Sequence, residues 1–159
     1  MSKHSKLFQS DLAIRHFVYQ TIVTTTSPPT VSETAVHFTI TENEAEAAYQ
    51  RLHNNHFFFL EPNTFSIRMA NPFSAVPTKF KVKVGTKSYW ANCAWDMLGI
   101  PAALHQDATI EAQYEDTNEE AVSTLVWHRL AADYSGRSAQ EIKTVFQQAN
   151  LTDTFWEVA

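Results

Sequence analysis

The chain has 159 residues, of which 44% are hydrophobic and 13% aromatic, with a formal net charge of −5 and a single cysteine. One cysteine excludes an internal disulfide and any site built from several cysteines. The acidic balance disfavours nucleic-acid partners, whose phosphates attract lysine and arginine. No apolar run approaches the length of a membrane span and no signal-peptide core follows the N-terminal residues. We therefore expect a soluble, cytoplasmic protein with no membrane partner.

The N-terminal part predicts three helices. Asp11 opens the first, in which apolar residues recur at helical spacing. Thr30 with Glu33, and Thr41 with Glu44, have the spacing of capping boxes and predict the starts of two further helices. The residues expected to face inward are Leu12, Ile14, Phe17, Val18 and Ile22 in the first helix, and Ala45, Ala48, Tyr49 and Leu52 in the third.

Strand-like segments at 57–60 and 64–69 follow the helices, so the element order is that of a winged helix. DNA binding is nevertheless disfavoured, because the third helix carries Glu42, Glu44 and Glu46 against one arginine, Arg51. Phosphates would repel such a helix.

The rest of the chain predicts a small sheet with helices. Side chains alternate over residues 80–84, and Gly85 turns the chain back into residues 87–90 as a β-hairpin. We predict an α+β fold with a winged-helix-like domain at 1–70, an extended linker at 71–79 and a C-terminal domain at 80–159. Later elements are expected as a strand at 108–112, an acidic loop at 115–120, and helices from about 123 to 134 and from about 138 to 149.

The cysteine follows this hairpin directly. Asn92 is a favourable N-cap residue, which would place Cys93 at the first position of a short helix ended by Gly99 and Pro101. The partial positive charge of a helix N-terminus favours a thiolate there. Asp96 lies three residues later on the same helix face, so a sulfur and a carboxyl group would share one small site. The alternative is that Cys93 is a buried packing residue among tryptophans.

Two long stretches, Phe65 to Thr78 and Tyr89 to Ala103, resemble the alkylmercury (organomercurial) lyase family. The first contains Met-Ala-Asn-Pro-Phe-Ser and the second Trp-Ala-Asn-Cys-Ala-Trp-Asp. The C-terminal segment from Ala131 to Trp156 also resembles the tail of shorter members, so the resemblance covers most of the chain. It implies a lyase that breaks a carbon–mercury bond by protonolysis.

The resemblance implies specific roles for the central residues. Cys93 matches the first catalytic cysteine, which binds mercury as substrate rather than as cofactor, and Asp96 matches the catalytic aspartate. A thiolate suits a soft metal, and a nearby carboxylic acid can protonate the departing carbon. Because thiolate and carboxylate are like charges, the pair should hold one proton between them near neutral pH. No cofactor is implied. Residues expected to line the small-molecule pocket are Trp90, Asn92, Trp95 and Phe73.

The chain departs from the family by lacking the second, downstream cysteine. The short distance from Ala112 to Ser123 suggests a shortened member in which the strand segment that carries this residue is deleted. Release of mercury would then require external thiols, and Glu111, Tyr114 and His105 are candidates to replace the thiol. The sequence leaves open an enzyme that acts on organomercurials or another electrophile, and a non-catalytic ligand-binding or regulatory module; a DNA-binding regulator is the least favoured.

Overall fold

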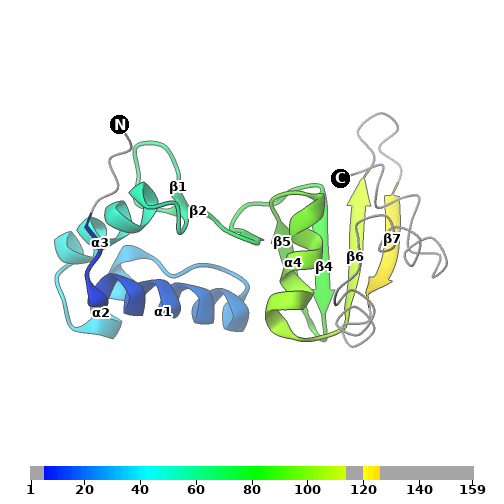
Figure 1. Ribbon diagram of the computed structural model, residues 1–159, viewed down its shortest axis with the longest axis horizontal. Helices are drawn as coiled ribbons and strands as arrows, with labels where there is room; N and C mark the ends of the chain where they lie inside the picture. Colours follow the sequence, from blue (N-terminus) through cyan, green and yellow to red (C-terminus); the bar gives the residue numbers. More distant parts are fainter. Residues whose placement is uncertain (1–5, 114–119, 126–159) are drawn as a thin grey trace. The chain divides into compact units, whose positions relative to one another are not determined.

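The computed structural model describes residues 6–113 and 120–125, which form parts of two compact units, residues 1–76 and 77–159 (Figure 1). We call these the first and the second unit. The first unit contains three helices followed by short antiparallel strands. Its elements are α1 (Gln9–Thr25), α2 (Val31–Phe38), α3 (Glu42–Asn54), β1 (Phe59–Leu60), β2 (Ile67–Ala70) and β3 (Phe73–Ser74).

The predicted starts of α2 and α3 are confirmed. The Thr30 hydroxyl accepts a hydrogen bond from the Glu33 N–H at 3.2 Å, and the Glu33 carboxylate accepts one from the Thr30 N–H at 2.7 Å. Thr41 and Glu44 repeat this arrangement at 3.2 and 2.8 Å. These reciprocal bonds satisfy N–H groups that a helix start would otherwise leave unpaired.

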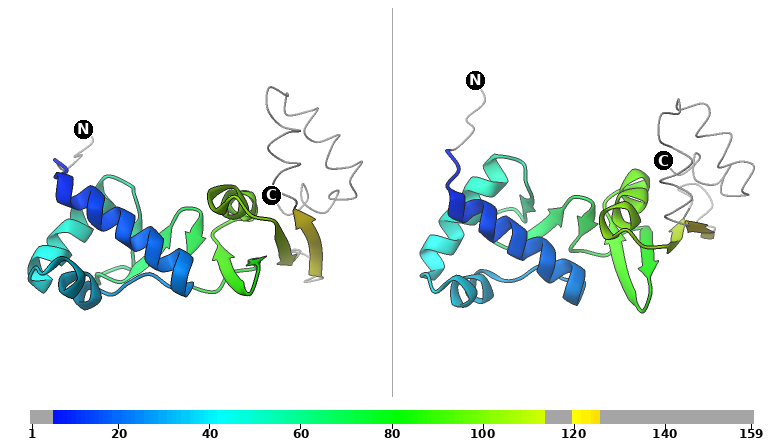
Figure 2. Two further views of the ribbon diagram at one scale, coloured as in Figure 1. Left: turned by 90° about the horizontal axis from the view of Figure 1, so that it is seen from below. Right: turned by 60° about the horizontal axis from the view of Figure 1, so that its bottom comes forward.

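The predicted inward faces of α1 and α3 form much of the core of the first unit. Of the predicted residues only two are not buried: Leu12 is exposed and Phe17 is half-buried. Figure 2 shows α1 running along one side of this unit. The buried residues are Ile14, Val18, Ile22, Ala45, Ala48, Tyr49 and Leu52.

An ion pair between α1 and α3 lies at the edge of this core. The side chain of Asp11 is fully buried and accepts two hydrogen bonds from the Arg51 guanidinium, at 2.7 and 2.9 Å, and one from the Phe8 N–H at 2.9 Å. Burial by itself would raise the pKa of Asp11, but the hydrogen bonds from Arg51 and Phe8, with the charge of Arg51, lower it. The guanidinium of Arg51, the one arginine of α3, is therefore held in an ion pair inside the protein.

The phenol of Tyr49 is a further buried polar group of this core. Its oxygen lies 2.7 Å from the Thr34 hydroxyl and donates to the Pro29 carbonyl at 3.1 Å. Burial raises the pKa of Tyr49 to about 12. The phenol is neutral at physiological pH, and its hydrogen bonds connect α2, α3 and the loop that precedes α2.

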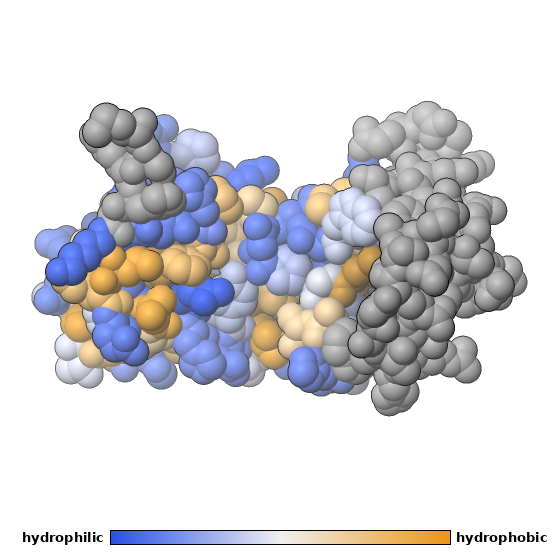
Figure 3. Space-filling model, in the orientation of Figure 1, coloured by the Kyte–Doolittle hydropathy of each residue, from blue (hydrophilic) through white to orange (hydrophobic). Residues whose placement is uncertain are grey.

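The segment predicted as an extended linker contains a strand. β3 pairs with β2 in antiparallel register, with Met69 opposite Ser74 and Ala70 opposite Phe73. The two prolines at the ends of this segment suggested an extended chain, and the backbone between them uses that extended conformation to make strand hydrogen bonds. On the first unit hydrophobic and hydrophilic residues are interspersed over the face shown in Figure 3.

The second unit contains β4 (Phe80–Val84), β5 (Lys87–Ala91), α4 (Ala94–Leu104), β6 (Ala108–Gln113) and β7 (Glu120–Leu125). Its strands are antiparallel, in the order β5-β4-β6-β7. The predicted hairpin is confirmed, and Gly85 has the positive φ of 57° that its turn requires. Helix α4 packs against β4, β5 and β6, and the buried residues of this layer include Val82, Val84, Tyr89, Met97, Ile100 and Ile110.

The helix predicted from about residue 123 is wrong over its first residues. Residues 120–125 form β7, which pairs with β6 from Ala108↔Leu125 to Gln113↔Glu120. Val122 and Thr124 are β-branched and favour a strand. The edge of β6 also supplies backbone hydrogen-bond partners, which local propensity does not take into account. Contrary to our expectation, the chain therefore does not pass directly from Ala112 into helices; the deletion of the family's cysteine-bearing strand segment stays a prediction. The rest of that helix, the helix at 138–149 and most of the acidic loop lie outside the described residues.

The predicted α+β class is confirmed by this arrangement of helices and antiparallel strands. Among the described helices, none is long and apolar enough to cross a membrane.

Candidate active site

The cysteine lies where the chain leaves the sheet and enters α4. Cys93 itself is the N-cap, with φ −149° and ψ 177°, and its carbonyl accepts the Asp96 N–H at 3.1 Å. The prediction that Asn92 is the N-cap is wrong by one residue. The backbone of Cys93 is still extended, so helical geometry begins only at Ala94.

The end of α4 also differs from the prediction. Gly99 and Pro101 lie inside the helix, which continues to Leu104 and ends at His105 with a left-handed φ of 53°. A proline inside a helix removes one backbone hydrogen bond. Here Pro101 is fully buried, and the packing of α4 on the sheet compensates for that loss.

The thiol and the carboxyl group predicted to share a site lie in contact. Cys93 Sγ is 3.5 Å from Asp96 Oδ2, a geometry in which the thiol donates to the carboxylate. The side chain of Cys93 is exposed and that of Asp96 is half-buried. The alternative of a buried packing cysteine is therefore excluded.

This pair has the N-cap and N3 spacing of the two capping boxes in the first unit, but its bonds differ. In α2 and α3 the hydroxyl of the N-cap residue accepts an N–H of the first turn, whereas the sulfur of Cys93 makes no such cap bond. Sulfur is a weak acceptor. The sulfur is bonded to Asp96 and stays exposed at the N-terminus of α4.

Trp90 lies on the sheet face opposite α4. Its neighbours Tyr89 and Ala91 are buried beneath α4, and side chains alternate along a strand, so Trp90 points the other way. It lies across from Lys81 in the register of β4 and β5, and the Lys81 ammonium is 5.9 Å from its ring centroid. A role for Trp90 in the pocket of Cys93 remains a prediction.

The other predicted pocket residues belong to different units of the chain. Trp95 is in the first turn of α4 and is 54% exposed, and Asn92 is half-buried between β5 and the helix. Phe73 is buried in β3 of the first unit. Their contribution to substrate binding stays a prediction.

Of the candidates to replace the missing thiol, Glu111 and His105 are not grouped with Cys93. Glu111 forms ion pairs with Lys83 and Lys81, and its hydrogen bond with Lys83 is the main cause that lowers its pKa. His105 is at the opposite end of α4, an 11-residue helix about 16 Å long. Tyr114 lies outside the described residues.

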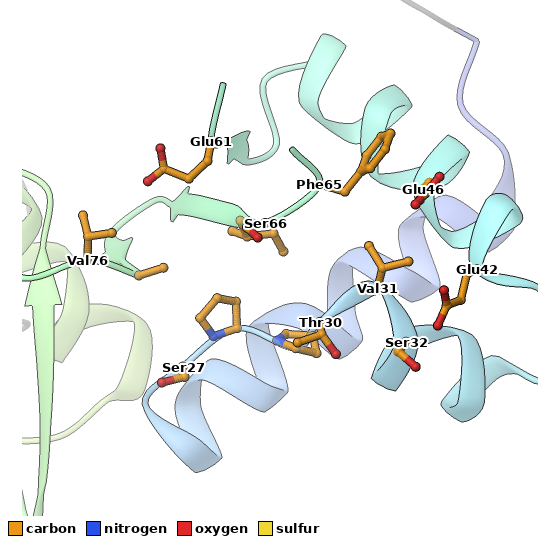
Figure 4. Close-up of a pocket in the computed structure, with 14 residues that line it drawn as sticks. Ser27, Thr30, Val31, Ser32, Glu42, Glu46, Glu61, Phe65, Ser66 and Val76 are labelled. Carbon is orange, nitrogen blue, oxygen red and sulfur yellow. The ribbon is translucent and has the colours of Figure 1, made fainter. Parts of the chain in front are cut away.

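Two clefts lie in the first unit, and none of the predicted site residues lines them. One has a volume of about 640 Å³ and lies between the loop before α2 and the β1–β2 connection (Figure 4). Glu42, Glu46, Val31 and Phe65 line it. The sequence did not indicate this cleft, because its two walls are some 35 residues apart in the chain.

A second cleft of about 520 Å³ is lined partly by His53. The ring of this histidine accepts the Leu60 N–H at 3.3 Å, a structural role. Within residues 6–113 and 120–125, no group of three or more His, Cys, Asp or Glu side chains is arranged to hold a metal ion.

Fold and site together define an α+β protein with a thiol and a carboxyl group paired at a helix N-terminus. The family model of alkylmercury lyase (MerB) matches residues 73–153, just over half of the chain, and this match includes Cys93 and Asp96. The chain belongs to the alkylmercury lyase family, as the sequence motifs predicted.

A solved structure supports the same fold. The crystal structure of the mercury-bound form of MerB2 matches with a TM-score of 0.60 and 22% sequence identity, over 76% of this chain and 57% of that chain. This chain thus spans little more than half the length of that relative. Among curated proteins, none matches the chain.

Proposed function

We propose that this protein is a lyase that cleaves the carbon–mercury bond of organomercurials by protonolysis, with Cys93 as mercury ligand and Asp96 as proton donor. The observation that carries the proposal is the 3.5 Å separation of Cys93 Sγ and Asp96 Oδ2 at the start of α4, inside the segment that matches the family. Thiol and acid are the two groups that the reaction needs at one place.

The first step is ligand exchange on mercury. The Cys93 sulfur displaces the anionic ligand of an organomercury cation, and a mercury–sulfur bond forms. The thiol proton passes to the Asp96 carboxylate, to which the thiol already donates. Mercury is soft and prefers a thiolate to oxygen or nitrogen ligands.

The second step is protonolysis. The carbon leaves mercury with the electron pair of the carbon–mercury bond and takes the proton from the Asp96 carboxylic acid, so a hydrocarbon departs. Mercury(II) remains on the Cys93 sulfur, and Asp96 is again a carboxylate. Because the chain has no second cysteine, a small external thiol completes the coordination of mercury and removes it.

The test is a single-turnover reaction of the protein with an arylmercurial and excess small thiol. We expect the wild-type protein to release one equivalent of arene. Absence of arene above the rate with the small thiol alone would contradict the proposal.

Replacing Asp96 by asparagine tests the assignment of the proton donor. The Asp96→Asn variant should bind one mercurial per molecule, because Cys93 is intact, but should release arene about a hundredfold more slowly, the lower range for loss of a general acid. Binding stoichiometry and arene release are measured on the same samples. Helix α4 contains no carboxylate other than Asp96. Glu111→Gln, on the opposite face of the sheet, therefore serves as the matched control for replacing a carboxylate by an amide. Unchanged release by Asp96→Asn would contradict the role of this carboxyl group.

The second candidate function is a non-catalytic ligand-binding module on the same scaffold. The cleft of about 640 Å³ in the first unit favours it, since its apolar residues and carboxylates suit a small organic ligand. Stoichiometric capture of the mercurial by Cys93 with no arene released would support this candidate over the lyase.

A further inference from the structure

The hydroxyl of Thr78 is inserted between β4 and the end of β5. Thr78 Oγ1 accepts the Phe80 N–H at 3.1 Å and donates to the Ala91 carbonyl at 2.7 Å. The Phe80 carbonyl is also within reach of this hydroxyl, at 3.1 Å, but lies farther from it than the Ala91 carbonyl does. The residue is half-buried, and Ala91 is fully buried. These bonds join the start of β4 to a carbonyl two residues before Cys93.

This hydroxyl lies where the strand ladder stops. β4 and β5 pair from Val84↔Lys87 to Lys81↔Trp90, so the next pair in register would be Phe80 with Ala91. The Thr78 hydroxyl occupies that step and relays the hydrogen bond from the Phe80 N–H to the Ala91 carbonyl. Buried backbone groups must be paired, so a side chain that bridges them lets the strands separate without leaving either group unsatisfied.

The strands separate just before α4. After Ala91 the chain leaves the sheet, passes through Asn92 and reaches Cys93, the N-cap of α4. The position of the Ala91 carbonyl therefore influences where the Cys93 sulfur lies relative to Asp96.

We propose that Thr78 is a positioning residue for Cys93: its hydroxyl holds the end of β5 so that the sulfur lies against the Asp96 carboxyl group. The effect of Thr78 on turnover rests on the proposed function. Its effect on the position of the Cys93 thiol does not depend on that function. Proton transfer between two side chains is sensitive to displacements of about 1 Å. Loss of the hydroxyl should thus slow the reaction without removing any reacting group.

The test compares Thr78→Val, which keeps the shape of the side chain but removes the hydroxyl, with Thr78→Ser, which keeps the hydroxyl. Thr109→Val, on β6 of the same sheet, is the control for loss of a threonine hydroxyl. Two properties are measured: the pH profile of Cys93 alkylation by iodoacetamide, and single-turnover arene release at saturating arylmercurial. Urea unfolding midpoints establish that each variant is folded under the assay conditions.

We expect Thr78→Val to change the alkylation profile and to release arene about tenfold more slowly, while its binding stoichiometry stays at one mercurial. Thr78→Ser and Thr109→Val should stay close to wild type in both measurements. Wild-type behaviour of folded Thr78→Val, or equal impairment of Thr78→Ser, would overturn the proposal. If the wild-type protein releases no arene, the lyase proposal fails, and the alkylation profiles still decide the role of Thr78.

Discussion

Replacing Cys93 by serine is expected to lower arene release from an arylmercurial by at least about a thousandfold, a typical scale for loss of the group that attacks the substrate. A serine hydroxyl is a hard, protonated ligand that does not compete for mercury. Since Cys93 is the single cysteine of the chain, the variant should also retain no mercurial after gel filtration. The measurement is single-turnover arene release together with mercury stoichiometry.

A relocated thiol provides the matched control. Ser88 is exposed on β5 of the same unit, so the double variant Cys93→Ser, Ser88→Cys carries one accessible cysteine away from the α4 N-terminus and Asp96. It should bind one mercurial and release no arene above the background of the small thiol. Release at the wild-type rate would contradict the assigned site, because it would mean that any accessible thiol suffices.

Replacing Asp11 by asparagine should destabilise the first unit by about 3 kcal/mol, the lower range for breaking a buried ion pair. The substitution leaves the Arg51 guanidinium, whose side chain is only 27% exposed, without its carboxylate. The three helices of this unit make far-UV circular dichroism a suitable probe of its urea unfolding. Glu42→Gln, which removes an exposed carboxylate on α3, controls for the change in net charge.

The same ion pair predicts a dependence on pH. The pKa of Asp11 is lowered in the folded protein from its ordinary value of 3.8, so the unfolded chain takes up the proton first as the pH falls. The stabilisation is therefore present above about pH 4 and is lost as the pH falls through the folded-state pKa. We expect the unfolding midpoint of wild type to approach that of Asp11→Asn in strong acid. If the unfolding midpoints of wild type and Asp11→Asn differed by the same amount in strong acid as at neutral pH, the assignment would be contradicted.

Much of the first unit could be predicted because its determinants are local. A capping box needs two residues three apart, as at Thr30 and Thr41, and an amphipathic helix repeats every three to four residues. The hairpin around Gly85 was predictable for the same reason. The spacing of Cys93 and Asp96 also predicted that the two residues are neighbours, because residues three apart at a helix start lie close together, but it did not fix how the sulfur is oriented toward the carboxyl group.

Tertiary structure decided the features that depend on partners distant in sequence. β7 is a strand because β6 offers an open edge, and α4 continues through Pro101 because its buried face packs on the sheet. The Thr78 bridge to Ala91 joins residues 13 apart. Sequence alone thus determines periodicity, caps and the reactive residue types. The start of α4 and the orientation of its thiol depend instead on backbone hydrogen bonds between strands, whose partners no local pattern specifies.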